Sequence, residues 1–398
     1  MRKLSLIIII VVISALYNSF GGLSQAEPKP EYGDGNANNM DLVYDVVKNS
    51  QISYIRSLQL PSGAIADNTH SNCMICGYFA NFACIALLKY PSPENVDVVK
   101  NYMQWYMGKL NGNVNIIKGG NEVIGSIYDY FLPYETTLGT YDSVDSYAAT
   151  FLMVAQEFAM LSADNKNWLM QYVAQLNLIA TALETCLDTE ENSIPTSFSH
   201  DDDDYLSIAS YVYPVKYLMD NCEVNRGLKA AKWLQDEGLL TTTSNYNILI
   251  SNNTNSIESE LWKGTMYNWM KNNDGTLISR WDNFYVDAVA QLYPAIFEVI
   301  GPYSDRANIL YTEFNNYYPN WSIGELPPST SFPWTIISLA AASINDKVRV
   351  DEYMTHIYSF NSVNEQKSLW YSLEAACVLL AIDKIENSNS APPYIPMN

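Results

Sequence analysis

The chain has 398 residues, of which 43 are Asp or Glu and 22 are Lys or Arg, and its formal charge is −21. A field of this sign repels nucleic acid and anionic membrane surfaces, so we expect neither as a partner. Only 16% of the residues are charged, whereas Tyr contributes 30 and Trp 9. These flat, amphipathic side chains suit the binding of sugars as well as the packing of a core.

The first 26 residues have the pattern of a secretory signal peptide. Arg2 and Lys3 precede an apolar run over 4–16, and the small residues Ser24 and Ala26 precede the expected cleavage site. The run is short for a membrane span, although an uncleaved anchor is the alternative. We therefore expect a signal peptide over 1–26, a linker over 27–39, one domain over 40–384 and a tail over 385–398. The mature chain should lie outside the cell and not insert into a membrane.

Helical periodicity recurs along the rest of the chain, with almost no alternating strand pattern. Apolar residues at three- and four-residue spacings predict helices over 40–58, 74–90, 93–110, 143–164, 166–187, 205–221, 224–237, 256–271, 285–300, 304–318, 332–345, 349–359 and 365–382. Alternate helices, such as the one containing "SYAATFLMVAQ", are apolar on all sides, which indicates burial on all sides. The sequence therefore predicts an all-α domain in which helical hairpins close into an (α/α)6 barrel.

Six loops precede the helices that we expect to form the inner ring, and an alternating barrel brings all six to one end. They span 61–72, 115–145, 191–205, 273–287, 320–334 and 360–370. Functional side chains concentrate in loops on a rigid scaffold, so these loops should rim one cavity. The residues expected to bind a ligand there are His70, Tyr128, Asp129, Tyr130, Tyr141, Trp281, Asp282, Asp287, Trp334 and Trp370. The structural alternatives are a salt bridge between Arg280 and Asp282 and a core tyrosine cluster around Asp129.

The order of helices resembles the six-hairpin (α/α)6-barrel glycosidase superfamily and, more distantly, the family-eight glycoside hydrolases. The stretches that carry the likeness are "SGAIAD" (62–67), "YDSVDSYAATFL" (141–152) and "RWDNFYVDAVAQLYPAIFEV" (280–299). In family eight an acid at an early inner helix protonates the leaving oxygen, and an aspartate-rich helix start follows. The resemblance implies Asp67 as the acid and Asp142 or Asp145 as the base or stabiliser. The chain departs from the family where "ADNTHSNCMICGYF" replaces a glutamate-containing motif.

The three acids also have a purely structural interpretation. Glycoside hydrolysis needs a protonated carboxyl on one side of the bond and an ionised one on the other. Asp67 could instead cap a local turn, and Asp142 and Asp145 occupy the spacing of a capping box at a helix start. Both interpretations remain open from the sequence.

Other polar motifs do not predict a metal site or a cofactor. "SHDDDDY" (199–205) lacks the glycine and the distal acid of a calcium loop, so we expect a solvated acidic cap, with casual cation binding as the alternative. "CMIC" (73–76) has no second Cys pair to complete a zinc site. Cys84 and Cys377 lie on apolar helical faces and should be free thiols.

The leading hypothesis is therefore a secreted glycoside hydrolase that cleaves a neutral or cationic polysaccharide with two carboxyl groups. A glycan-binding protein with the same aromatic cleft and no catalysis is the first alternative. A polysaccharide lyase is the second, with His70, tyrosines and Arg280 supporting β-elimination, although the negative charge of the chain disfavours an acidic sugar.

Overall fold

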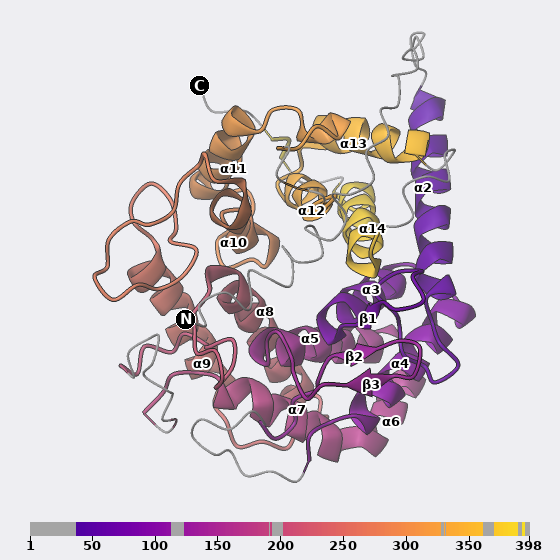
Figure 1. The fold of residues 1–398 in the computed structure, drawn as a ribbon, viewed down its shortest axis with the longest axis vertical. Helices are drawn as coiled ribbons and strands as arrows, with labels where there is room; N and C mark the ends of the chain where they lie inside the picture. The colour runs from indigo at the N-terminus through magenta and orange to yellow at the C-terminus, as the bar shows by residue number, and fades with distance from the viewer. Residues whose placement is uncertain are drawn as a thin grey trace.

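The computed structural model describes residues 37–112, 123–190, 192, 202–327, 330, 332–360, 370–388 and 392–394. The expected signal peptide, most of the expected linker and part of the expected tail lie outside the described residues. Within the described ranges, helices form two concentric rings (Figure 1). None of these helices is both long enough and apolar enough to cross a membrane.

The inner ring contains α3 (Gly77–Lys89), α5 (Asp145–Leu161), α8 (Leu218–Asp236), α10 (Tyr293–Ile296), α12 (Ile336–Ser343) and α14 (Ser372–Glu386). The outer ring contains α2 (Ala37–Ser57), α4 (Pro93–Gly108), α6 (Ala163–Leu169), α7 (Val173–Thr185), α9 (Tyr246–Ser256), α11 (Asp305–Tyr317) and α13 (Lys347–Phe360). Four short helical turns adjoin them: η1 (Met170–Tyr172), η2 (Ile257–Leu261), η3 (Phe284–Ala288) and η4 (Trp321–Ile323). The alternation of outer and inner helices confirms the predicted all-α (α/α)6 barrel.

The inner helices pack closely where small side chains meet. At the crossing of α5 and α8, a Cβ added to Gly227 would lie 2.5 Å from the Cβ of Ala149, so only glycine allows this approach. Three outer helices, α4, α6 and α11, begin at a serine that caps the first turn. Ser92, Ser162 and Ser304 each accept a backbone N–H from three residues downstream with the side-chain oxygen.

The last hairpin contacts the first and closes the ring. The Ser372 N–H donates to the carbonyl of Asp67 at 2.7 Å. The Tyr90 hydroxyl donates to the carbonyl of Leu379 at 2.9 Å, and Lys48 donates to Glu386 at 2.9 Å. Helix α14 therefore joins both α2 and α3, as Figure 1 shows.

Three predicted helices are wrong in their extent. The helix expected over 285–300 is divided into η3 and the short α10. The other two errors have a local cause. The helix expected over 205–221 begins only at Leu218, because Pro214 has no backbone N–H to donate within a helix. The helix expected over 256–271 ends at Leu261, and Gly264 follows with a φ of 86°, which no right-handed helix contains.

A small antiparallel sheet and free thiols complete the domain. Strands β1 (Met74–Ile75), β2 (Tyr130–Phe131) and β3 (Thr136–Thr137) pair in that order, so the loops before α3 and α5 are joined. All six cysteines are buried and free. This agrees with the prediction for Cys84 and Cys377.

Candidate active site

The described parts of the six loops meet at one end of the barrel, as the alternation of helices predicts. The loops before α3 and α5 share the sheet, and the Val144 N–H donates to the carbonyl of Ala209 in the loop before α8. The Lys271 N–H then donates to the carbonyl of Lys216, which joins the loops before α8 and α10. Aromatic contacts from Tyr285 onward, described below, connect the loops before α10, α12 and α14. The hydrogen bond from the Ser372 N–H to the carbonyl of Asp67 joins the loop before α14 to the loop before α3 and completes the ring of loops.

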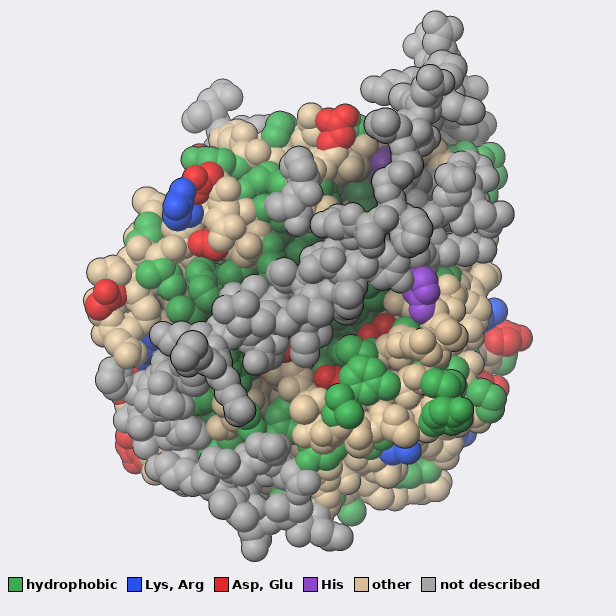
Figure 2. Space-filling view, in the orientation of Figure 1, with side chains coloured by type: hydrophobic (Ala, Val, Ile, Leu, Met, Phe, Trp, Pro, Cys, Tyr) green, Lys and Arg blue, Asp and Glu red, His purple; other side chains and the backbone are tan. Residues whose placement is uncertain are grey.

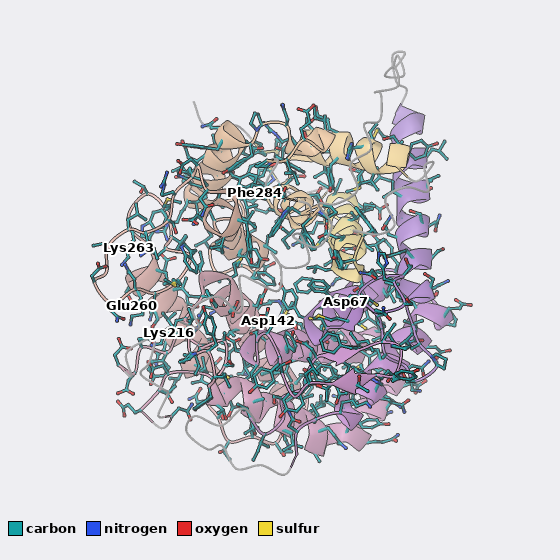
Figure 3. All side chains as sticks on the ribbon, in the orientation of Figure 1. Asp67, Asp142, Lys216, Glu260, Lys263 and Phe284 are labelled. Atoms are coloured by element: carbon teal, nitrogen blue, oxygen red, sulfur yellow. The ribbon has the colours of Figure 1, made fainter. Side chains whose placement is uncertain are left out.

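A hollow lies inside this ring of loops. Asp142 is exposed to water, and yet desolvation by the surrounding protein raises the pKa of its carboxyl to about 6, with the charge of Asp145 as the second cause. Tyr285 is 38% exposed, and desolvation raises the pKa of its phenol as well. A side chain that water reaches and that protein nonetheless surrounds must line a concave surface. On this face Figure 2 shows hydrophobic side chains with acidic side chains between them, and Figure 3 places Asp67 and Asp142 on the inner side of the rings.

Three carboxyl groups lie near enough to the phenol of Tyr285 for their charges to raise its pKa. After desolvation, the charges of Asp142, Asp220 and Glu223 are the causes that raise the pKa of Tyr285. Asp220 and Glu223 lie one helical turn apart at the start of α8 and therefore share a face. Asp142, in the loop before α5, completes the group.

Asp220 and Glu223 are held in their protonated forms more strongly than Asp142. Desolvation, followed by the charges of Asp145, Glu223 and Asp142, raises the pKa of Asp220 well above its ordinary value, although its side chain is only half-buried. Glu223 is 2% exposed, and desolvation raises its pKa to about 8 even though the Tyr78 hydroxyl donates a hydrogen bond to it. Neighbouring carboxyl groups with different protonation states are what acid/base chemistry requires.

Two further carboxyl residues, Asp129 and Asp67, lie on the side of this group nearest α3. Together with Asp142, Asp220 and Glu223 they form what is called the acidic wall below. The Tyr147 hydroxyl donates to Asp129 at 2.9 Å, and desolvation raises the pKa of Asp129 to about 7. Asp67 is 4% exposed and accepts the Cys76 N–H at 2.9 Å. Desolvation raises its pKa well above the ordinary value, with the charge of Asp129 adding to the effect.

Asp145 lies behind the wall and does not line the hollow. Its side chain is 0% exposed, and its two oxygens accept the hydroxyls of Ser143 and Ser207 and the N–H of Ser146. It is the first residue of α5, so neither it nor Asp142 occupies the capping-box positions expected for them. We assign Asp145 a positioning role, because a fully enclosed carboxylate cannot contact a substrate, and Asp142 alone of the pair is accessible.

Aromatic side chains form a second wall. The ring of Tyr285 lies 4.5 Å from that of Trp334, and Phe332 packs 5.2 Å from Trp334 and 5.2 Å from Tyr371. Tyr371 then meets Phe79 of α3 at 5.8 Å. The indole N–H of Trp334 is buried and has no hydrogen-bond partner among the described residues. The wall offers apolar faces and an unused donor.

The structure disperses several residues that the sequence grouped as ligand-binding. Tyr130 packs against Trp105 of α4 at 5.4 Å, which places it in the outer layer. Trp370 donates its indole N–H to Gln51 of α2, and Trp281 stacks on Tyr317 of α11. These three aromatic residues stabilise the junctions with outer helices instead of lining the hollow.

The remaining candidates are divided between the rim and the loop framework. Tyr128 and Tyr141 stack on each other at 5.6 Å beside Asp129 and Asp142 in the chain, and His70 is exposed. Asp282 forms an exposed ion pair with Arg280, which agrees with the structural alternative. Asp287 is 4% exposed and accepts the Arg280 N–H and the Asn283 amide, so it stabilises its own loop.

Sequence reasoning missed Asp220, Glu223 and Tyr285. The two acids stand in "MDNCEVN" at a three-residue spacing, which predicts a shared helical face once a helix is placed there. The helix boundary drawn through this stretch at 221–224 concealed that spacing. Tyr285 lies between Asp282 and Asp287 in the sequence, and only the two acids of this stretch were predicted to bind a ligand.

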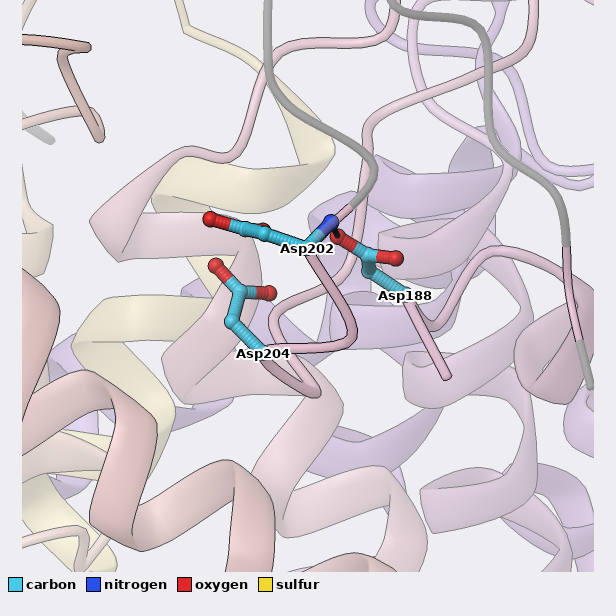
Figure 4. A group of neighbouring side chains, drawn as sticks. All are labelled: Asp188, Asp202 and Asp204. Carbon is cyan, nitrogen blue, oxygen red and sulfur yellow. Dashed lines mark hydrogen bonds between the residues drawn. The ribbon is translucent and has the colours of Figure 1, made fainter. Parts of the chain in front are cut away.

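A second acidic cluster lies outside the hollow and is neutralised by lysines. Asp188, Asp202 and Asp204 bring their carboxyl groups together, as Figure 4 shows. The fully buried ammonium of Lys216 lies 2.5 Å from Asp188, 2.8 Å from Asp204 and 3.0 Å from Asp202, and Lys271 lies 2.6 Å from both Asp202 and Asp204. In the described part of "SHDDDDY", Asp202 and Asp203 are exposed, as a solvated cap predicts, but Asp202 and Asp204 also pair with Lys216 and Lys271, which the sequence did not predict.

No family model and no curated protein matches the chain. Solved structures do resemble it. A cellobiose 2-epimerase from Spirochaeta thermophila has a TM-score of 0.57 at 9% identity, covering 88% of this chain and 98% of that one. A novel alpha-amylase from Clostridium perfringens has 0.55 at 10%, covering 85% and 97%, and a wild-type glycosidase has 0.54 at 9%, covering 88% and 99%. At such identities the likeness concerns the fold, and it shows that the chain has the (α/α)6-barrel fold of the six-hairpin glycosidase-like proteins.

Proposed function

We propose that the protein is a glycoside hydrolase whose catalytic carboxyl groups are Asp142 and Asp220. The observation that supports this most directly is their shared position opposite Tyr285, with one carboxyl accessible and ionised near neutral pH and the other half-buried and protonated. Two-carboxyl hydrolysis requires this division of roles. The likeness to glycosidases makes carbohydrate the substrate class to test first.

Each residue has a specific task in this mechanism. Asp220 donates its proton to the leaving glycosidic oxygen, and Asp142 acts on the opposite side of the bond as general base or charge stabiliser. Asp145 keeps the pKa of Asp142 and Asp220 raised through its charge, and its bond to Ser207 fixes the loop before α8. The aromatic wall from Tyr285 to Phe79 stacks on the sugar rings.

Asp67 remains the alternative acid that the family resemblance implies. Its raised pKa keeps it protonated, as an acid requires, but its side chain is 4% exposed and its nearest acidic neighbour is Asp129. Asp220 is the more accessible of the two, and for that reason we assign the proton to Asp220.

The test combines product analysis with leaving-group dependence. The mature chain is incubated with neutral and amine-bearing polysaccharides, and new reducing ends are measured for the parent and for Asp142→Asn, Asp220→Asn and Asp67→Asn. We expect Asp142→Asn to lose about 10³-fold in turnover on every substrate, because an amide cannot accept a proton. Asp220→Asn should lose as much on polysaccharide and much less on an aryl glycoside, whose leaving group needs no proton. Asp97→Asn, an exposed acid on α4, is the control.

Three other outcomes of these turnover measurements would contradict the proposed assignment. Full turnover in both Asp142→Asn and Asp220→Asn would show that the chemistry lies elsewhere. The leaving-group pattern in Asp67→Asn in place of Asp220→Asn would restore Asp67 as the acid. Glycan binding by a parent that cleaves none of the substrates would identify a glycan-binding protein.

A further inference from the structure

Trp334 has a backbone conformation that its residue type disfavours. Its φ is 55°, in the left-handed region, where the Cβ of an L-residue comes too close to the backbone. Such a conformation persists only where the surrounding structure holds it, and it is found most often at ligand sites and catalytic sites. Trp334 therefore requires contacts that fix it in place.

Glu374 of α14 supplies one of these contacts. The peptide unit that joins Trp334 to Thr335 is fixed at both ends. Its carbonyl accepts the Ile337 N–H at 3.0 Å, and its N–H donates to the carboxyl of Glu374 at 2.8 Å. The Thr335 hydroxyl also donates to the backbone carbonyl of Glu374 at 3.0 Å. Because the side chain of Glu374 is 1% exposed, this junction excludes water, and a buried, satisfied set of hydrogen bonds favours a single geometry.

The ring of Trp334 supports the exposed end of the aromatic wall. It lies 4.5 Å from the ring of Tyr285, and Phe284 meets it edge-on at 5.6 Å. Trp334 is 9% exposed whereas Tyr285 is 38% exposed, so Trp334 lies behind the ring that a ligand can reach. A shift of Trp334 would therefore displace Tyr285.

We propose that Glu374 is a positioning residue, which fixes Trp334 behind Tyr285 and so keeps the aromatic wall in the shape on which a sugar ring stacks. This inference rests on the proposed function for the presence of a sugar. Glu374 itself touches no substrate, because its carboxyl is enclosed at the junction of α12 and α14. Removal of the carboxyl would leave the Thr335 N–H unpaired in the core, and the peptide unit would rotate to find another acceptor.

Fluorine NMR of the full mature chain, labelled with 5-fluorotryptophan, reports the position of Trp334 without any ligand. Trp334→Phe assigns the resonance. Glu374→Met keeps the length of the side chain without the carboxyl acceptor, and we expect it to displace this resonance. Glu374→Gln should leave the resonance in place, because the amide oxygen still accepts the N–H. Asp346→Leu is the control, since it removes a carboxyl that is 4% exposed beyond the other end of α12.

Kinetics on a polysaccharide that the parent cleaves measure the consequence. Glu374→Met should raise KM about fivefold or more and change kcat less than about twofold, because the contact that it weakens is remote from the reacting atoms. Glu374→Gln should retain both values. In a Tyr285→Ala background, Glu374→Met should raise KM by less than about twofold more, since its effect passes through the ring that is already absent.

Three results would overturn the inference. They are an unmoved Trp334 resonance in Glu374→Met, the same displacement in Glu374→Gln or in the Asp346→Leu control, and an equal rise of KM in the two backgrounds. Glu374→Ala takes the place of Glu374→Met in every comparison if that variant does not fold. A parent that cleaves no polysaccharide would reject the proposed function alone, because the fluorine resonance tests the position of Trp334 independently of activity.

Discussion

Replacing Lys216 by Met should destabilise the protein strongly. The ammonium group is fully buried and contacts three carboxyl groups, of which Asp188 is also 0% exposed and has one oxygen without a hydrogen-bond partner. Lys271 still pairs with Asp202 and Asp204 in the variant, but Asp188 loses its cation. Removing one partner of a buried pair costs about 3–5 kcal/mol, and we expect this loss in the free energy of unfolding at pH 7.5.

The loss should depend on pH in a defined direction. Burial already raises the pKa of Asp188 to about 6 in the folded protein, and removal of Lys216 raises it further. The deficit is therefore full above the folded pKa of Asp188 in the variant. It shrinks as pH falls toward about 6, because below that pH Asp188 is protonated in the folded parent as well as in the folded variant. Urea unfolding at pH 7.5 and pH 5 measures both values, with Lys263→Met, at a half-buried lysine outside the ion network, as the control. A loss below about 1 kcal/mol, or one independent of pH, would refute the reasoning.

Three other predictions concern the rings and the hollow. Gly227→Ala should lower the free energy of unfolding by about 1–3 kcal/mol, because the new methyl group would collide with Ala149. Gly108→Ala, at a helical position with nothing within 4 Å, should be neutral or slightly stabilising, and equal effects in the two variants would contradict the packing argument. The value of kcat/KM should decline about tenfold per pH unit below pH 6, as Asp142 gains its proton, and a flat acid limb would exclude it as the base. Native protein should not react with a thiol reagent at Cys84 or Cys377, whereas unfolded protein should; rapid native labelling would show that these thiols are accessible.

The barrel was predictable because its signal is repeated along the chain. Inner helices such as α5 and α14 are mostly apolar and buried on most sides, and they alternate along the chain with more polar outer helices. The errors arose where one residue overrides a periodic pattern. Pro214 precedes the delayed start of α8, and Gly264 follows the early end of η2, although the spacing of apolar residues looks helical on both sides of each.

The site was predictable only in part, because burial is a tertiary property. "YDSVDS" does not reveal that Asp142 reaches the hollow while Asp145 is enclosed by hydroxyls from Ser143 and from the distant Ser207. Likewise, the short distance from Tyr130 to Trp105 depends on the pairing of β2 with β1. Loop position identified the correct end of the barrel, and only the packing of the loops separates the side chains that line the hollow from those that hold the loops together.

The closure of α14 against α2 and α3 constrains the order in which the molecule can be completed during synthesis. The hydrogen bonds from Lys48 to Glu386 and from Tyr90 to Leu379 join residues 338 and 289 positions apart. A chain that emerges from the ribosome with its first five hairpins still lacks the helix that covers one side of α3, so apolar surface near the N-terminus stays uncovered until the final residues arrive. We therefore expect the ring to close only once α14 has been synthesised, with apolar surface of α3 uncovered until then.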